Sequence, residues 1–167
     1  TDKKKDEAKR YCPKTYYFHE NFSKMRPVKQ KHFRELLDPP NIVNDKYFIT
    51  GRYPQLFKIC QEQIHKRNTI YQYRRVYMRV NKKGQCPTLT ANMGTGGHNV
   101  PIILINKKKD RYRKLTPEEC FRFQGYKNTS KLPKNVADGQ LYKQAGNSVT
   151  VPLIKKIAAN IKKALEL

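Results

Sequence analysis

The clearest hydrophobic pattern in this chain lies near its C-terminal end, where apolar residues recur at intervals of three and four. This spacing places them on one face of a helix and leaves lysines on the other faces. Pro152 suits the first turn of such a helix, because its missing N–H would have no partner there in any case. The pattern predicts an amphipathic helix from about residue 151, with an apolar stripe made by Val151, Ile154, Ala158, Ile161 and Leu165.

Two helices are predicted in the first half of the chain. Residues 28–38 place apolar side chains on one face, and Pro39 ends the segment because a proline cannot continue a helix. Residues 54–66 show the same kind of pattern, with Pro54 in the first turn.

A third helix is marked by its start signal. Thr116 and Glu119 have the spacing of a capping box, in which each side chain accepts a hydrogen bond from the backbone N–H of the other. This predicts a helix over residues 117–124, ended by Gly125.

Extended segments are predicted between these helices. Residues 70–80 are rich in aromatic and β-branched residues and indicate a strand or one arm of a bent hairpin, with a turn at 81–84. Residues 88–91 should continue extended before a glycine-rich loop at 93–99, and residues 100–105 read as a buried strand. Short strands among helices predict an α+β fold.

Charge is the strongest compositional signal. Lys and Arg number 36 against 13 Asp and Glu in 167 residues, which gives a formal net charge of +23. Such an excess repels itself and favours a polyanionic or acidic partner. With 11 Tyr and 7 Phe among the basic residues, nucleic acid is favoured over a membrane, and no apolar run reaches the length of a membrane span.

The cysteines and histidines show no metal-binding spacing. Cys12, Cys60, Cys86 and Cys120 are far apart in sequence, and the four histidines are equally isolated, so no metal site is expected. We expect reduced thiols, with Cys60 and Cys120 buried on helix faces. Reduced cysteines fit a cytoplasmic protein.

A run of small polar residues, from Gly146 to Val149, stands directly before the predicted C-terminal helix. A helix start leaves backbone N–H groups without partners, so a polar ligand can dock there. Ser148 or Thr150 can instead accept one of these N–H groups and cap the helix. On these residues alone, an ordinary helix cap is the better interpretation.

Three longer blocks change that balance. Residues 140–154, which contain the small polar run, are similar to the last sequence block of the cytosine-5 DNA methyltransferases. Residues 113–126 resemble the block before it, and residues 86–101 resemble the end of that family's target-recognition region. The three blocks stand in the family's order and spacing, which is more specific than any single short motif. The resemblance covers residues 70–167 closely and 28–69 loosely.

The resemblance implies double-stranded DNA as a partner. A guanidinium group can bind guanine O6 and N7 with two hydrogen bonds, so the arginines of residues 71–79 are candidates for base reading, although a solvated strand face is the alternative. In the family, the glycine-rich loop enters the major groove and its first threonine holds a phosphate beside the extruded base. The candidate DNA-binding residues are therefore Arg74, Arg75, Arg79, Thr88, Thr90, Asn92 and His98.

The resemblance also implies S-adenosylmethionine as the cofactor. Tyr126, Asn147, Ser148 and Val149 would line one wall of its pocket, because amide and hydroxyl groups supply hydrogen bonds while aromatic and aliphatic groups cover apolar parts of the ligand.

A structural role is implied for Arg113, Glu119 and Arg122, because their block organises the recognition domain in the family. The alternative is a surface ion pair between Glu119 and Arg122, which are three residues apart. The implied organisation is a basic tail and surface segment at 1–27, a small target-recognition domain at 28–112, and C-terminal blocks at 113–167. The closing helix would dock on a Rossmann-like methyltransferase domain that this chain does not contain.

The family's chemistry requires a Pro-Cys nucleophile, and no cysteine here follows a proline; Cys86 precedes Pro87. The glycine-rich cofactor block and the Glu-Asn-Val block are also missing. No catalytic residue is therefore expected in this chain. The resemblance implies the recognition part of a restriction-modification methyltransferase for a short G/C-rich site, with the catalytic cysteine supplied by another segment or subunit. The alternative is a stand-alone basic DNA-binding module.

Overall fold

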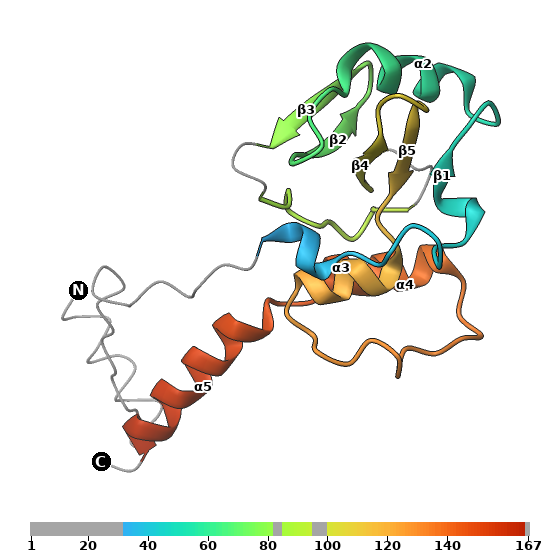
Figure 1. The fold of residues 1–167 in the computed structure, drawn as a ribbon. Coiled ribbons are helices and arrows are strands. Elements are labelled where there is room, and N and C mark those ends of the chain that lie inside the picture. The colour runs from blue at the N-terminus through green and yellow to red at the C-terminus, as the bar shows by residue number, and fades with distance from the viewer. Residues whose placement is uncertain (1–31, 82–84, 95–99, 166–167) are drawn as a thin grey trace. The chain divides into compact units, whose positions relative to one another are not determined.

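The computed structural model describes residues 32–81, 85–94 and 100–165 (Figure 1). The described residues up to Thr150 belong to one compact unit, and α5 (Val151–Leu165) belongs to a second. The first unit combines an antiparallel sheet with short helices, so the predicted α+β class is confirmed. The predicted tail at 1–27 and the candidate His98 lie outside the described residues.

The sheet of the first unit has five strands in the order β1-β5-β4-β2-β3, and every neighbouring pair is antiparallel. The buried strand predicted at 100–105 is confirmed as the central strand β4. The strands are β1 (Phe48–Ile49), β2 (Ile70–Arg74), β3 (Tyr77–Asn81), β4 (Pro101–Asn106) and β5 (Arg111–Lys114).

Each face of the sheet has its own hydrophobic core, because successive side chains of a strand point to opposite faces. On one face, Tyr71 and Ile102 belong to a cluster with Cys60 and Ile64, which come from α2 (Pro54–Gln63) and its C-terminal cap. On the other face, the core joins the sheet to α3 (Pro117–Phe123) and α4 (Asp138–Asn147). That second core includes Ile70, Ile103, Leu115, Cys120, Phe121, Tyr142 and Ala145.

The two helices predicted from proline and capping signals are present. α2 begins at Pro54 as expected but ends at Gln63, three residues before the predicted end. In α3, Thr116 and Glu119 form both hydrogen bonds of the capping box. Cys60 and Cys120 are both fully buried on these helices, which confirms the expectation for the two thiols.

Two predictions for the first half of the chain are wrong in detail. Within the described part of the segment predicted as a helix at 28–38, residues 32–38, the regular structure is a 3-10 turn, η2 (Phe33–Leu36), and a second such turn, η3 (Asp45–Tyr47), follows it. Residues 70–80 were predicted as one strand or one arm of a hairpin, but they form both arms of a hairpin whose turn is Arg75-Val76. Most of the turn predicted at 81–84, residues 82–84, lies outside the described residues. Arg75 takes φ 53° in this turn. Glycine or asparagine usually occupies such a position, and because neither is present, no local signal predicts the turn.

Helix α4 was not predicted at all. Gly139 and Gly146 both lie inside the helix, although glycine is a poor helix former. The boundary expected between residues 112 and 113 falls within β5, whose ladder with β4 continues to Lys114. In the structure, the compact unit that contains the sheet extends through Thr150.

Candidate functional site

The loop of residues 85–94, which we call the recognition loop after the family region that its sequence resembles, is anchored in the core. Leu89 and Met93 are buried in the same cluster as Tyr142 and Ala145 of α4. Residues 88–91, predicted to be extended, form no strand. The apolar anchors hold the loop against α4, while its threonines reach the surrounding cavities.

Two glycines allow the recognition loop to approach α4 closely. A Cβ atom on Gly146 would lie 2.2 Å from the backbone carbonyl carbon and oxygen of Thr90, so only a glycine fits at this helix position. Gly94 has φ 83°, and a Cβ there would meet the Tyr142 ring at 2.6 Å. The absence of a side chain at these two glycines therefore allows the loop and the helix to pack in direct contact.

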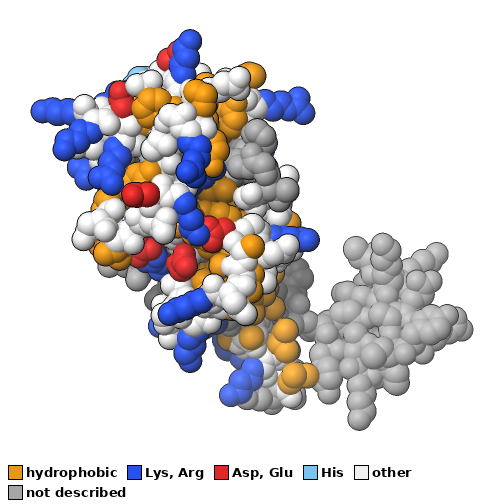
Figure 2. Space-filling view, turned by 90° about the vertical axis from the view of Figure 1, so that its right-hand side faces the viewer, with side chains coloured by type: hydrophobic (Ala, Val, Ile, Leu, Met, Phe, Trp, Pro, Cys, Tyr) orange, Lys and Arg blue, Asp and Glu red, His pale blue; other side chains and the backbone are white. Residues whose placement is uncertain are grey.

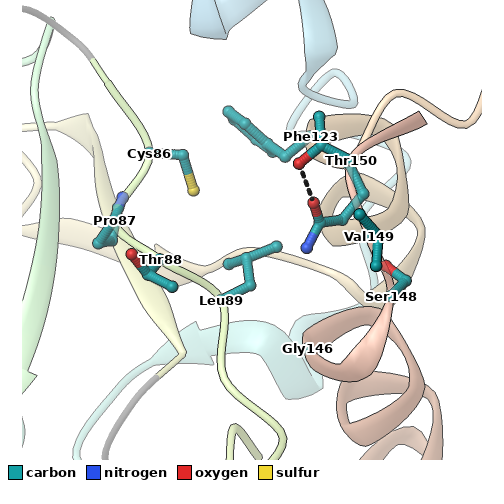
Figure 3. Close-up of a pocket in the computed structure, with 10 residues that line it drawn as sticks. Cys86, Pro87, Thr88, Leu89, Phe123, Gly146, Ser148, Val149 and Thr150 are labelled. Carbon is teal, nitrogen blue, oxygen red and sulfur yellow. Dashed lines mark hydrogen bonds between the residues drawn. The ribbon is translucent and has the colours of Figure 1, made fainter. Parts of the chain in front are cut away.

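A cavity of about 450 Å³, the motif cavity, separates the start of the recognition loop from the segment that follows α4. Figure 3 shows Cys86, Pro87 and Thr88 on one side and Ser148 and Val149 on the other, with Leu89 between them. The cavity is lined by Cys86, Pro87, Thr88, Leu89, Phe123, Gln124, Gly146, Ser148, Val149 and Thr150.

Hydrogen bonds fix the α4 side of the motif cavity. Ser148 Oγ donates to the carbonyl oxygen of Ala145 at 2.8 Å, and Gln124 Nε2 donates to the same oxygen at 3.1 Å. Thr150 Oγ1 donates to Gln124 Oε1 at 3.0 Å (Figure 3). Across the cavity, burial raises the pKa of the Cys86 thiol to about 12. A neutral thiol is a poor nucleophile at neutral pH.

The structure brings two of the four predicted cofactor residues to this cavity. Ser148 and Val149 line it, whereas Asn147, the last residue of α4, and Tyr126 do not. Tyr126 packs edge-on against Phe121 at 5.4 Å between ring centroids. Sequence reasoning missed three cavity residues that stand within or beside the quoted blocks: Phe123, Gln124 and Thr150.

A second cavity of about 280 Å³, the arginine groove, lies between the β2-β3 hairpin and the recognition loop. Arg74 and Arg79 line it together with Thr88 and Thr90, so four predicted DNA contacts meet here. Its full lining is Gln72, Arg74, Arg79, Asn81, Gln85, Cys86, Pro87, Thr88 and Thr90. The alternation of side chains along β2 and β3 would have pointed to Gln72 and Asn81.

Two further candidates lie outside the groove lining. Arg75 is exposed in the hairpin turn, and Asn92 accepts a hydrogen bond from Thr90 Oγ1 at 2.6 Å through its Oδ1. Asn92 therefore holds the conformation of the recognition loop. Lys and Arg side chains are spread over the face of the molecule that Figure 2 presents.

The predicted structural residues belong to one network of ion pairs, which is buried at Arg113 and Glu119 and partly exposed at Arg122. Arg113 and Glu119 are both fully buried and form two hydrogen bonds of 2.7 Å between guanidinium and carboxylate. Glu119 also accepts from the backbone N–H of Asp38 at 2.7 Å, and Arg122 pairs with the Asp38 carboxylate. The alternative of a surface pair between Glu119 and Arg122 is wrong, because each residue has a different partner.

Residues 32–81, 85–94 and 100–165 contain no group of three or more His, Cys, Asp or Glu arranged to hold a metal ion. Within the same ranges, every helix is too short or too polar to cross a membrane.

The first unit thus combines an antiparallel sheet with two adjoining cavities, one lined by arginines and the other by hydroxyl and apolar groups. The family of C-5 cytosine-specific DNA methylases matches residues 2–163, and the chain belongs to this family. The type II methyltransferase M.Bsp6I of Bacillus sp. (strain RFL6) is 46% identical over 150 residues, which cover 90% of this chain and 46% of the relative. The chain thus spans about half of that relative's length.

Other comparisons agree with this assignment. A DNA-cytosine methyltransferase of Escherichia coli (strain K12) is 31% identical over 156 residues, covering 83% of this chain and 32% of the relative. A solved structure of the Entamoeba histolytica methyltransferase EhMeth superposes with a TM-score of 0.56 at 18% identity, over 83% of this chain and 42% of that one. At this low identity, the structural likeness shows the fold.

Proposed function

We propose that this chain provides the DNA-recognition surface and one wall of the S-adenosylmethionine pocket of a cytosine-5 DNA methyltransferase. The observation that carries the proposal is the shared wall of the two cavities: Cys86, Pro87 and Thr88 line both. Methyl transfer needs the target base beside the methyl donor. A single segment between the arginine groove and the motif cavity provides that proximity.

The motif cavity suits part of a nucleoside cofactor. Its volume of about 450 Å³ lies within the range of small-molecule sites, roughly 300–1,000 Å³. Ser148 and Thr150 provide hydroxyl groups, while Phe123 and Val149 provide apolar surface for a base or ribose. S-adenosylmethionine supplies an activated methyl group when bound. Here, these residues would hold and orient it.

The arginine groove suits duplex DNA. Arg74 and Arg79 carry forked donors that match guanine, which fits a short G/C-rich site, and Thr88 can donate to a phosphate oxygen. Thr90 lines the groove beside it and remains a proposed contact. The net charge of +23 adds a salt-dependent attraction to any duplex. Arg75, Asn92 and His98 remain proposed contacts, and Tyr126 and Asn147 remain proposed cofactor residues.

The catalytic cysteine is proposed to come from another segment or subunit. Cys60 and Cys120 are fully buried, and Cys86 is held neutral by its raised pKa.

Helix α5 carries the surface proposed to dock on the catalytic domain. Five large apolar side chains along it are exposed: Leu153, Ile154, Ile157, Ile161 and Leu165. The enzyme would belong to a cytoplasmic restriction-modification system.

Changing Ile157 to Asp should abolish binding to the catalytic part, because a carboxylate would enter an apolar interface without a partner. Lys155→Asp on another face of α5 is the matched control and should leave binding within about three-fold of wild type. The test pairs the full chain with the portion of M.Bsp6I outside the matched region and measures affinity and tritiated methyl transfer to duplex DNA.

If both variants bind this portion equally well, α5 is not the docking surface. If wild type binds duplex DNA yet never supports methylation with any polypeptide that carries the Pro-Cys block, the chain is a stand-alone DNA-binding module and the proposed function is wrong.

A further inference from the structure

A buried carboxamide lies beneath the arginine groove. The side chain of Gln72 lines the groove, although the residue is only 1% exposed. Its Oε1 accepts a hydrogen bond from Arg74 Nε at 3.1 Å. Burying a carboxamide is unfavourable unless it is hydrogen-bonded, and this one is bonded to an arginine of the groove.

The backbone at Gln72 is held from both sides. In the sheet it is paired with Arg79 of β3 and with Pro101 of β4. Arg74 follows two residues later on the same strand and therefore projects from the same face. Arg74, two residues along β2, and Arg79, opposite on β3, are thus both neighbours of Gln72 in the sheet and line the groove with it. Arg75 lies in the hairpin turn instead.

The bond to Gln72 also selects which edge of Arg74 faces a ligand. It uses the Nε–H, so the two terminal nitrogens form the fork that can bind two acceptors at once. Guanine presents such a pair, O6 and N7, in the major groove, and no other base presents two acceptors there. A guanidinium held by one edge loses less freedom on binding than a mobile one.

We propose that Gln72 is a positioning residue that fixes the Arg74 guanidinium to read one guanine of the target site. This inference rests on the proposed function and adds the residue that sets base discrimination. Gln72 itself does not contact the base. Its effect should therefore appear in sequence discrimination and leave general DNA affinity unchanged.

The test uses the full chain and a pool of randomised duplexes, from which wild type selects its preferred site. Each guanine of that site is then replaced by 7-deazaguanine, which lacks the N7 acceptor. For wild type, one replacement should weaken binding about ten-fold, as loss of a bidentate contact does. In Gln72→Met, this penalty should fall to about two-fold, while affinity for an unrelated duplex stays within about two-fold.

Two further variants separate positioning from a general structural role. Gln72→Glu keeps an acceptor for Arg74 Nε and should retain the ten-fold penalty of wild type. Adding Gln72→Met to Arg74→Ala should change discrimination no further, because the positioned group is already gone.

The inference is overturned if Gln72→Met keeps the full penalty, or if Gln72→Glu loses it as completely as Gln72→Met. If the Gln72 variants do not fold, Arg74→Ala decides: it removes the guanidinium, and a retained penalty would overturn the inference. The proposed function fails in a different way, when wild type selects no site from the pool.

Discussion

Replacing Arg113 with methionine should lower the free energy of unfolding by about 3–5 kcal/mol, because it leaves a buried carboxylate without its partner. Glu119 is fully buried, and its carboxylate accepts a hydrogen bond of 2.7 Å from each terminal nitrogen of Arg113. The same carboxylate accepts from the backbone N–H groups of Asp38 and Thr116. One ion pair therefore joins the end of β5, the start of α3 and the segment after η2.

Urea unfolding followed by circular dichroism measures this effect, because the chain has no tryptophan. Arg122→Met is the matched control: its pair with Asp38 is partly exposed and should contribute no more than about 1 kcal/mol. The double variant Arg113→Met with Glu119→Met should be more stable than Arg113→Met alone, because it removes the orphaned charge. An Arg113→Met variant within about 1 kcal/mol of wild type would contradict the structural role.

Changing Gly146 to alanine should weaken specific DNA binding and lower stability by about 1–3 kcal/mol, the usual cost of overpacking. The added methyl group would lie 2.2 Å from the Thr90 carbonyl, and backbone atoms cannot move aside as a side chain can. Either α4 or the recognition loop must shift. Since Thr88 and Thr90 line the arginine groove, the shift should reach the proposed DNA surface.

Gly139→Ala in the same helix is the matched control. No atom lies within 4 Å of its added Cβ, and alanine should stabilise a helix position by up to about 1 kcal/mol. Affinity for the selected duplex and amide hydrogen exchange of residues 85–94 should change in Gly146→Ala and not in Gly139→Ala. Equal behaviour of the two variants would mean that the contact between loop and helix does not hold the DNA surface.

Part of this fold could be predicted because its local signals agree with its packing. Proline at the first turn predicts α2, the capping box predicts α3, and a continuous apolar run predicts β4. The apolar period likewise gave α5 from Val151. For α2, α3 and β4, the residues that form the element also pack its apolar side chains into the core, so sequence pattern and tertiary structure point the same way. The apolar side chains of α5 are exposed instead.

The missed elements depend on contacts that are distant in sequence. β5 is rich in charge, and one of its arginines is buried only because Glu119 neutralises it. α4 contains Gly146, a poor helix residue that the backbone of Thr90 requires. The short hairpin turn places a non-glycine residue, Arg75, at positive φ. Pairing across the fold overrides local preference in all three cases.

The candidate site was predictable to the extent that it lies in short blocks. Thr88, Ser148 and Val149 were expected at ligand-binding surfaces, and they line cavities. The meeting of the β2-β3 hairpin with the recognition loop required the sheet register, because only the register places Gln72 and Arg79 opposite one another.

The most direct measurement of the central claim is tritiated methyl transfer from S-adenosylmethionine to duplex DNA, by the purified full chain with and without a polypeptide that carries the Pro-Cys block. We predict incorporation only in the mixture, and its loss when the cysteine of that added block is changed to serine. Incorporation by this chain alone, abolished by Cys86→Ser, would place the nucleophile here and contradict the account.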